Sequence, residues 1–204
     1  STPKPLIIGR DKEIEWIDRT ANEFLAETRA IAKGLMKYGL KKGDGVAFMC
    51  RTCYEWNLTD AAIMAVGGVL ATIYDTDSAE QIRNIVNNSD ARLLIVQDTD
   101  MREKADGAIE ECPSLEHIIT INTGGLDELK AYGAGVTDEE LDERIESVKK
   151  TDLCSIVYTS GSTAAPKGVE MTHEHYCATA LNLPDFMPEM LSDKRNPVLL
   201  FLPQ

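Results

Sequence analysis

Tyr158-Thr159-Ser160-Gly161-Ser162-Thr163-Ala164-Ala165-Pro166-Lys167-Gly168 is the stretch from which the fold of this chain can be worked out. Apolar runs flank it, from Leu153 to Val157 and from Val169 to Met171. Hydroxyl residues, glycines and a proline between two apolar runs indicate a polar loop that joins two strands. Backbone N–H groups, hydroxyls and one lysine suit a bound polyphosphate. A mobile surface hairpin is the alternative that composition leaves open, because Gly, Ser and Pro also mark ordinary turns.

The order of the residues excludes one well-known kind of phosphate loop. A Walker loop has Gly, four residues and then Gly-Lys-Ser/Thr, with a helix beginning at the lysine. Here Gly161 is followed after four residues by Pro166-Lys167-Gly168. A proline replaces the second glycine and a β-rich run follows the lysine, so a kinase-like or GTPase-like function is not indicated.

Upstream of the loop, apolar runs alternate with helical patterns. Capping boxes at Thr20 to Glu23 and Ser78 to Gln81 predict the starts of two helices, and Gly39 predicts the end of the first. The all-apolar run Val46 to Cys50 is typical of a strand buried on both faces of a parallel sheet. The alternation predicts an α/β fold, with right-handed crossovers, a mainly parallel sheet and helices on both of its faces. The other strands are expected at 69–74, 93–96 and 118–121, and the other helices at 56–68 and 100–112.

We expect three parts in the chain. Residues 1–121 form the α/β unit, and residues 122–150 form a surface connection that ends in an acidic helix capped by Thr137. Residues 151–204 form the phosphate-loop segment, in which a helix follows Thr172 and Pro184 and Pro188 break the chain.

Composition limits the classes of partner. The 204 residues carry a net charge of -13, which disfavours a nucleic-acid binder because no basic field is available to neutralise phosphates. No apolar run reaches the length of a membrane span, and no secretory signal is visible. An odd number of cysteines, five, argues for reduced thiols. We therefore expect a cytoplasmic protein.

Two of the cysteines are spaced as Cys50-Arg51-Thr52-Cys53. This is the spacing of a redox pair or of half a zinc site, but no second pair follows at a suitable distance. A redox pair is expected to open a helix, where the thiolate is stabilised. Buried or idle thiols are the default interpretation.

The ordered loop resembles the signature of the adenylate-forming (AMP-binding) enzymes, Tyr-Thr-Ser-Gly-Ser/Thr-Thr-Gly-x-Pro-Lys-Gly-Val. Tyr158 to Val169 match it in every place except Ala164, where the family normally has glycine. The segment Gly39 to Ala47, the pair Glu55-Trp56 and the run Met171 to His173 also resemble the family. Leu126 to Leu129 and the acidic helix look most like the long-chain fatty acyl-CoA synthetases. The fold implied is the amino-terminal part of the large domain of these enzymes.

The resemblance implies two half-reactions. A fatty acid carboxylate attacks the α-phosphorus of ATP, giving an acyl-adenylate and pyrophosphate, and the thiol of coenzyme A then takes the acyl group. The implied ligands are therefore a fatty acid, ATP with Mg²⁺, and coenzyme A. The loop is implied to bind the ATP phosphates, with Lys167 as the cation and Thr159 also as a metal ligand. The residues implied to bind ATP are Thr159, Ser160, Gly161, Ser162, Thr163, Ala164 and Lys167.

Several alternatives stay open at this point. The family places its adenine, ribose and catalytic lysine sites far downstream, so we expect the carboxy-terminal domain to be absent from these 204 residues and the chain alone to be inactive. The acceptor thiol could instead belong to an acyl-carrier protein. A non-catalytic anion-binding module is the alternative of another class, favoured by Ala164, which would strain the loop if the family's glycine has a positive φ. His173 is expected to cap the following helix or fill the core. Peripheral membrane contact and self-association of the complete protein are also left open.

Overall fold

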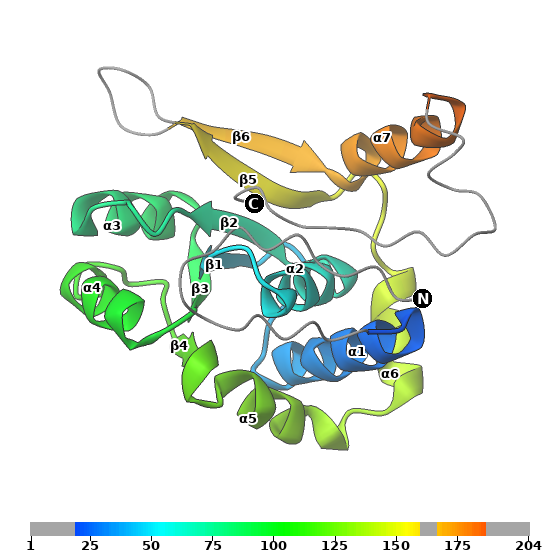
Figure 1. The fold of residues 1–204 in the computed structure, drawn as a ribbon, viewed down its shortest axis with the longest axis horizontal. Helices are drawn as coiled ribbons and strands as arrows, with labels where there is room; N and C mark the ends of the chain where they lie inside the picture. Colours follow the sequence, from blue (N-terminus) through cyan, green and yellow to red (C-terminus); the bar gives the residue numbers. More distant parts are fainter. Residues whose placement is uncertain (1–18, 160–166, 187–204) are drawn as a thin grey trace, which may run out of the picture.

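The computed structural model describes residues 19–159 and 167–186. Within these residues the strands form a six-stranded sheet in the order β4-β3-β1-β2-β5-β6 (Figure 1). The first five strands are parallel to their neighbours and β6 is antiparallel to β5, which confirms the mainly parallel sheet. The strands are β1 (Gly45–Met49), β2 (Val69–Ile73), β3 (Ala91–Val96), β4 (His117–Thr120), β5 (Leu153–Thr159) and β6 (Lys167–Thr172).

Helices cover both faces of this sheet. The α-helices are α1 (Ala21–Lys37), α2 (Tyr54–Ala65), α3 (Ala79–Asn88), α4 (Thr99–Ile109), α5 (Gly125–Tyr132), α6 (Asp138–Glu146) and α7 (His173–Phe186). Two short 3₁₀ turns, η1 (Ile121–Thr123) and η2 (Gly133–Gly135), flank α5. No helix in the described part of the chain is both long enough and apolar enough to span a membrane.

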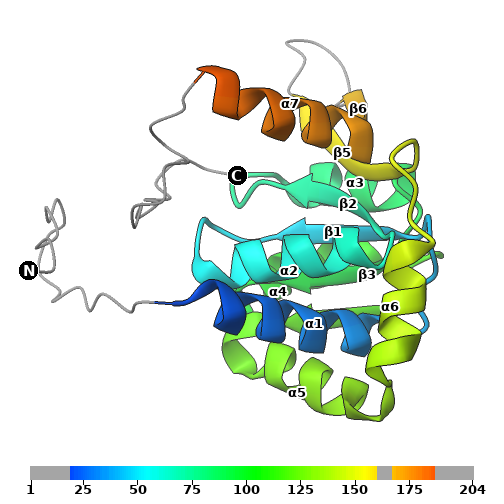
Figure 2. The same cartoon turned by 90° about the vertical axis from the view of Figure 1, so that its right-hand side faces the viewer.

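The direction of each crossover decides which face its helix covers. The β1–β2 connection runs one way along the sheet, whereas the β2–β3 and β3–β4 connections run the other way. Because parallel crossovers keep one hand, α3 and α4 lie on the face opposite α2. The return connection from β4 to β5 brings α5 and α6 back to the side of α1 and α2 (Figure 2).

Strand β1 lies at the centre of both hydrophobic cores. All five of its residues are buried. Phe48 belongs to the core under α1 and α2, while Ala47 and Met49 belong to the core under α3 and α4. This confirms the prediction that an all-apolar run here marks a strand covered on both faces.

Capping chemistry fixes the helix starts. Thr20, Ser78 and Thr137 each form a reciprocal capping box with the residue three positions later, so three helices begin where the sequence predicts. Gly39 follows α1 with a φ of +89°, which lets the chain reverse toward β1.

Segment 122–150 packs against α1. Leu126, Leu129 and Leu141 are at most 5% exposed and join the α1–α2 core. A Cβ on Gly34 of α1 would strike the backbone carbonyl of Leu129, so the glycine permits the close crossing of α1 and α5. Most of the acidic side chains of α6 face solvent, as predicted.

Three predicted boundaries differ from the structure: the helices expected at 56–68 and 100–112 end earlier, at Ala65 and Ile109, and there is no break at Pro184. Pro184 was expected to break the chain, but α7 continues to Phe186. The fixed φ of proline is itself helical, and two residues from the end of a helix its missing N–H costs one hydrogen bond. Pro188 lies outside the described residues.

Candidate functional site at the carboxyl edge of the sheet

The polar loop begins at the carboxyl edge of the parallel strands. Strand β5 runs parallel to β2, so Thr159 leaves the sheet on the same side as the ends of β1, β2 and β3. Open α/β sheets bind their ligands beyond this edge, because the loops that follow neighbouring strands converge there. Thr159, from which the loop leaves the sheet, therefore lies at the edge where such folds bind their ligands.

The β5–β6 register holds the two ends of the loop together. Tyr158 pairs with Gly168, and Thr159 pairs with Lys167. The side chains of Thr159 and Lys167 are both exposed at the end of the hairpin from which the loop leaves. Of the predicted ATP-binding residues, the structure brings these two together; the other five lie outside the described residues, namely Ser160, Gly161, Ser162, Thr163 and Ala164.

A tyrosine next to the loop anchors the hairpin to helix α3. Tyr158 is 4% exposed, and its hydroxyl donates to Oδ1 of Asn88, at the end of α3, over 2.7 Å. Burial raises the pKa of this phenol, which keeps it neutral as a donor. A Cβ on Gly168 would lie 2.7 Å from Cγ2 of Ile156 and 3.2 Å from Cε1 of Tyr158, so the glycine leaves room for the ring. Sequence reasoning missed Asn88, since nothing in a helix end points to a partner 70 residues away.

Charged side chains gather beyond the ends of β1, β2 and β3. Arg51 contacts Asp75 through Nε at 2.8 Å and Asp98 through Nη1 at 3.2 Å. The backbone N–H of Arg51 donates to Oε1 of Gln97 over 3.0 Å. One guanidinium thus bridges the segments after three strands and helps to fix the edge at which the loop begins. The signal in the sequence was a polar residue after each apolar run, which sequence reasoning did not use.

A histidine caps the helix after the hairpin, but it is His175, so of the two roles predicted for His173 the capping role is wrong. The backbone N–H of Thr172 donates to Nδ1 of His175 over 3.0 Å, as the third residue of a capping box would accept it. His173 is half-buried instead, and burial lowers its pKa. Its Nε2 is buried without a hydrogen-bond partner among the described residues.

Helix α2 carries a buried acid on the side of β5 and α7. Oδ1 of Asp60 has no hydrogen-bond partner among the described residues. Burial raises the pKa of Asp60 to about 7. Burial also raises the pKa of Cys154 on β5 and of Tyr176 on α7, and the charge of Asp60 adds to both shifts. The Asp60 carboxyl is thus neutral at acidic pH and ionises only as the pH rises through about 7.

The Cys50–Cys53 pair stands at the start of α2. Cys53 is the N-cap residue of this helix, and the two sulfurs are 3.5 Å apart. All five cysteines are free thiols. Within the described residues no three His, Cys, Asp or Glu side chains gather as a metal site. The structure thus gives the pair the helix-opening position that a redox role requires, and the described residues supply no further ligands for a zinc site.

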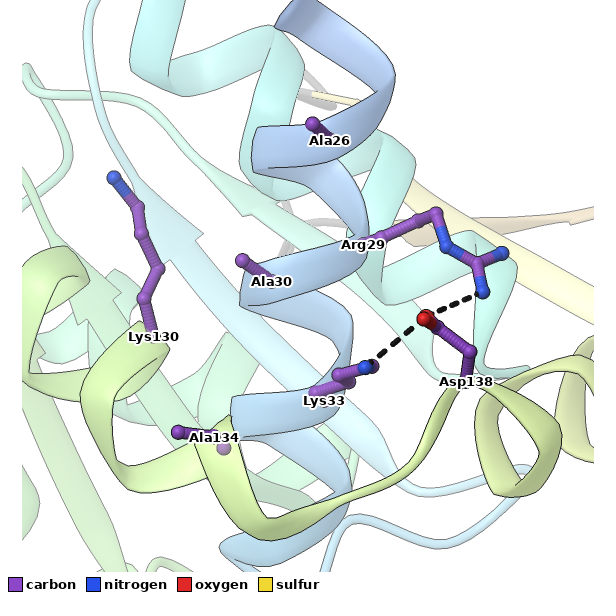
Figure 3. A pocket seen from close by; sticks show the side chains of 8 residues that line it. Ala26, Arg29, Ala30, Lys33, Lys130, Ala134 and Asp138 are labelled. Atoms are coloured by element: carbon purple, nitrogen blue, oxygen red, sulfur yellow. Dashed lines mark hydrogen bonds and ion pairs between the residues drawn. The ribbon is translucent and has the colours of Figure 1, made fainter.

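A surface hollow of about 450 Å³ lies between α1 and the segment from α5 to α6 (Figure 3). Its cations are already neutralised by nearby carboxylates. Arg29 and Lys33 both contact Asp138, at 2.9 and 3.1 Å, and Lys130 contacts Asp127 at 3.0 Å. The ion pairs tie α6 to α1 and leave little free positive charge for a ligand.

Comparisons with known proteins agree with this architecture. The family described as AMP-binding enzyme matches residues 4–204. The long-chain-fatty-acid–CoA ligase FadD15 of Mycobacterium bovis is 35% identical over 191 residues, which are 92% of this chain and 32% of that protein. The chain therefore spans about a third of the length of this relative.

Solved structures share the fold. A long-chain-fatty-acid–CoA ligase (FadD1) from Archaeoglobus fulgidus superposes with a TM-score of 0.69 and 23% identity, over 86% of this chain and 34% of that chain. ATP-bound MatB from Rhodopseudomonas palustris superposes with a TM-score of 0.66 and 22% identity, over 82% of this chain and 32% of that chain. On the match of the family over nearly the whole chain, this protein belongs to the AMP-binding enzymes.

Proposed function

We propose that this chain supplies the phosphate-binding loop of an ATP-dependent long-chain fatty acyl-CoA synthetase. The complete enzyme joins a fatty acid to the AMP part of ATP, releases pyrophosphate and passes the acyl group to coenzyme A. The observation that carries the proposal is the pairing of Thr159 with Lys167 at the carboxyl edge of the sheet. Membership in the AMP-binding family and the likeness to a long-chain-fatty-acid–CoA ligase support it.

The hairpin is suited to stabilise a leaving polyphosphate. As the bond to the α-phosphorus breaks, negative charge accumulates on pyrophosphate, and donors fixed in advance lower the barrier. Lys167 is an exposed cation at the residue that follows the loop, on a strand end that pairing holds in place. We propose that the backbone and hydroxyls of Thr159 to Thr163 provide the remaining donors.

The exposed strand ends at Thr159 and Lys167 also suit Mg²⁺ that binds together with the nucleotide. Mg²⁺ in such sites is held chiefly by phosphate oxygens and water, with one or two protein oxygens. Thr159 presents one hydroxyl in the exposed part of β5, beside the lysine position. When bound, the ion would neutralise phosphate charge, and Thr159 would orient it.

We also propose that these 204 residues form one wall of the site. The relative with 35% identity is about three times as long, which leaves room for adenine, ribose and acceptor sites elsewhere. On this proposal the chain alone does not complete either half-reaction. Five free thiols support a reducing, cytoplasmic location for the complete protein.

The test is the reaction of the complete protein that contains these residues. It is incubated with ATP, Mg²⁺ and a long-chain fatty acid, and mass spectrometry follows acyl-adenylate, first alone and then with coenzyme A or an acyl-carrier protein. We expect adenylate without acceptor and acyl-CoA with coenzyme A. If the adenylate reacts with the acyl-carrier protein and not with coenzyme A, the carrier protein is the acceptor and the proposed acceptor is wrong. If the protein releases no pyrophosphate in response to fatty acid, the synthetase function is refuted.

A further inference from the structure

The two thiols at the start of α2 lie in contact but in different surroundings. Cys50 follows β1 and is 9% exposed, within the α1–α2 core. Its sulfur is 3.5 Å from that of Cys53 and also donates to the backbone carbonyl of Arg51 over 3.2 Å. Cys53 is half-buried and therefore reaches solvent more readily. The pair therefore consists of a partly exposed thiol, Cys53, in contact with a buried thiol, Cys50.

The local electrostatics favour a thiolate on the outer cysteine. The contact with the Cys50 thiol and the backbone amide of Trp56 in the first turn of α2 lower the pKa of Cys53, against the opposing effects of burial and Glu55. The same contact with Cys53, together with burial, raises the pKa of Cys50. A thiolate at a helix N-terminus beside a protonated partner is the arrangement of a reactive dithiol.

Other cysteines of the described chain are held differently. The thiol of Cys112, which follows α4, is directed at the carbonyl of Ala108 in that helix, and that of Cys154 at the carbonyl of Met171 on β6. Cys177 is exposed on α7. The contact between two thiols therefore sets Cys50 and Cys53 apart from ordinary packing cysteines.

We propose that Cys50 and Cys53 form a thiol–disulfide exchange site that reacts with low-molecular-weight disulfides such as oxidised glutathione. Cys53 attacks one sulfur of oxidised glutathione; a bond between Cys53 and glutathione forms as the glutathione disulfide breaks, and one glutathione leaves with the proton that Cys53 released. Cys50 then loses its proton and attacks the Cys53 sulfur, and the second glutathione leaves with that proton. Two protein thiols are oxidised to one disulfide, and one oxidised glutathione is reduced to two molecules of glutathione.

The two sulfurs must move closer together to form the disulfide. A disulfide requires sulfurs about 2.05 Å apart, and the two thiols start at 3.5 Å. The site lies at the carboxyl edge of the sheet, where Arg51, between the two cysteines, contacts Asp75 and Asp98. In a reducing compartment such a bond would be transient, as cytosolic disulfides usually are. The proposal is independent of ATP and of the proposed synthetase activity.

The test compares three chains in a Cys177→Ser background, which removes the exposed thiol. The folded, reduced chain is incubated with oxidised glutathione, quenched by alkylation and analysed by peptide mass spectrometry. With both cysteines present we expect a Cys50–Cys53 disulfide that dithiothreitol removes. Cys50→Ser should keep one glutathione on Cys53, and Cys53→Ser should leave Cys50 free of glutathione.

Two results would overturn the proposal. One is a parent chain, shown to be folded by circular dichroism, in which Cys50 and Cys53 stay reduced under conditions that modify Cys177 of the unsubstituted chain. The other is equal glutathione labelling of Cys50 and Cys53 in the two single variants. If Cys53→Ser is unfolded at the assay temperature, Cys53→Ala replaces it in the same comparison. If both variants of Cys53 are unfolded, the presence or absence of the Cys50–Cys53 disulfide in the parent chain decides the outcome.

Discussion

Thr159 lies directly opposite Lys167 in the antiparallel pair of β5 and β6. A threonine and a lysine from the two ends of the loop are thereby paired at the loop end of the hairpin. The hairpin itself is attached to the sheet on one side, through the pairing of β5 with β2 and the hydrogen bond from Tyr158 to Asn88. The properties of the loop should therefore depend on how firmly its base is held.

Gly168→Ala should destabilise the fold. The new Cβ would lie 2.7 Å from Ile156 and 3.2 Å from Tyr158, and overpacking of this kind costs about 1–3 kcal/mol. Urea unfolding measures the change. Gly107→Ala is the matched control: it has open space around it within α4, and alanine is favoured over glycine in helices by roughly 0.5–1 kcal/mol, so this variant should be more stable. Equal effects of the two substitutions would contradict the packing argument.

Tyr158→Phe should remove the hydrogen bond that anchors the hairpin. We expect a loss of about 0.5–1.5 kcal/mol in the free energy of unfolding. The exposed side of Asn88 can then bind water, which favours the lower end of this range. A double-mutant cycle with Asn88→Ala isolates the pairwise contribution. Additive effects of the two substitutions would show that the contact contributes nothing to stability.

Much of the fold follows from local signals in the sequence. The capping residues Thr20, Ser78 and Thr137 begin helices as predicted, because a cap and its partner are only three residues apart. Alternation of strands and helices also predicts parallel pairing, since crossovers through helices favour it.

The features of the fold that could not be predicted from the sequence depend on contacts between distant segments. The strand order and the partnership of Tyr158 with Asn88 are decided by packing and by the direction of each crossover. Segment 122–150 was expected to be a surface connection, and its mixture of acidic residues and spaced leucines did not reveal how deeply Leu129 and Leu141 are buried. At the candidate site the loop signature identified the residue types, but only the β5–β6 register shows that Thr159 and Lys167 face each other.

Asp60→Asn should stabilise the protein at alkaline pH. Burial raises the pKa of Asp60 from 3.8 to about 7, so between these values the folded state holds a proton that the unfolded state has released. Stability therefore falls as pH rises through this window, and the loss is complete above it. The neutral asparagine should exceed wild type at pH 8.5 by on the order of 1–4 kcal/mol and match it near pH 4.

Thermal unfolding at several pH values checks this difference. Glu143→Gln is the control, because Glu143 is exposed on α6 and its removal should give no comparable pH-dependent gain. A constant offset between Asp60→Asn and wild type at all pH values would show that ionisation of Asp60 does not oppose folding.

Thr159→Val should change the metal dependence of the complete enzyme. Valine keeps the shape of the side chain and suits the strand end, but it removes the hydroxyl proposed to contact Mg²⁺. We expect half-maximal adenylation to require a Mg²⁺ concentration about tenfold higher, since one lost ligand interaction of roughly 1.4 kcal/mol corresponds to that factor. Thr172→Val at the other end of β6 should leave the metal requirement unchanged. An unchanged metal requirement in Thr159→Val would remove Thr159 from the proposed site.

The most direct test of the phosphate role is the rate of fatty-acid-dependent pyrophosphate release by the complete protein with Lys167→Ala. Lys41→Ala is the control, because Lys41 is exposed and lies before β1, at the amino edge of the sheet. Loss of a preorganised donor to developing charge typically lowers the rate by about 10²-fold or more. We predict a loss of that size for Lys167→Ala and a rate within about twofold of wild type for Lys41→Ala. Equal rates in the two variants would contradict the assignment of the hairpin to the ATP phosphates.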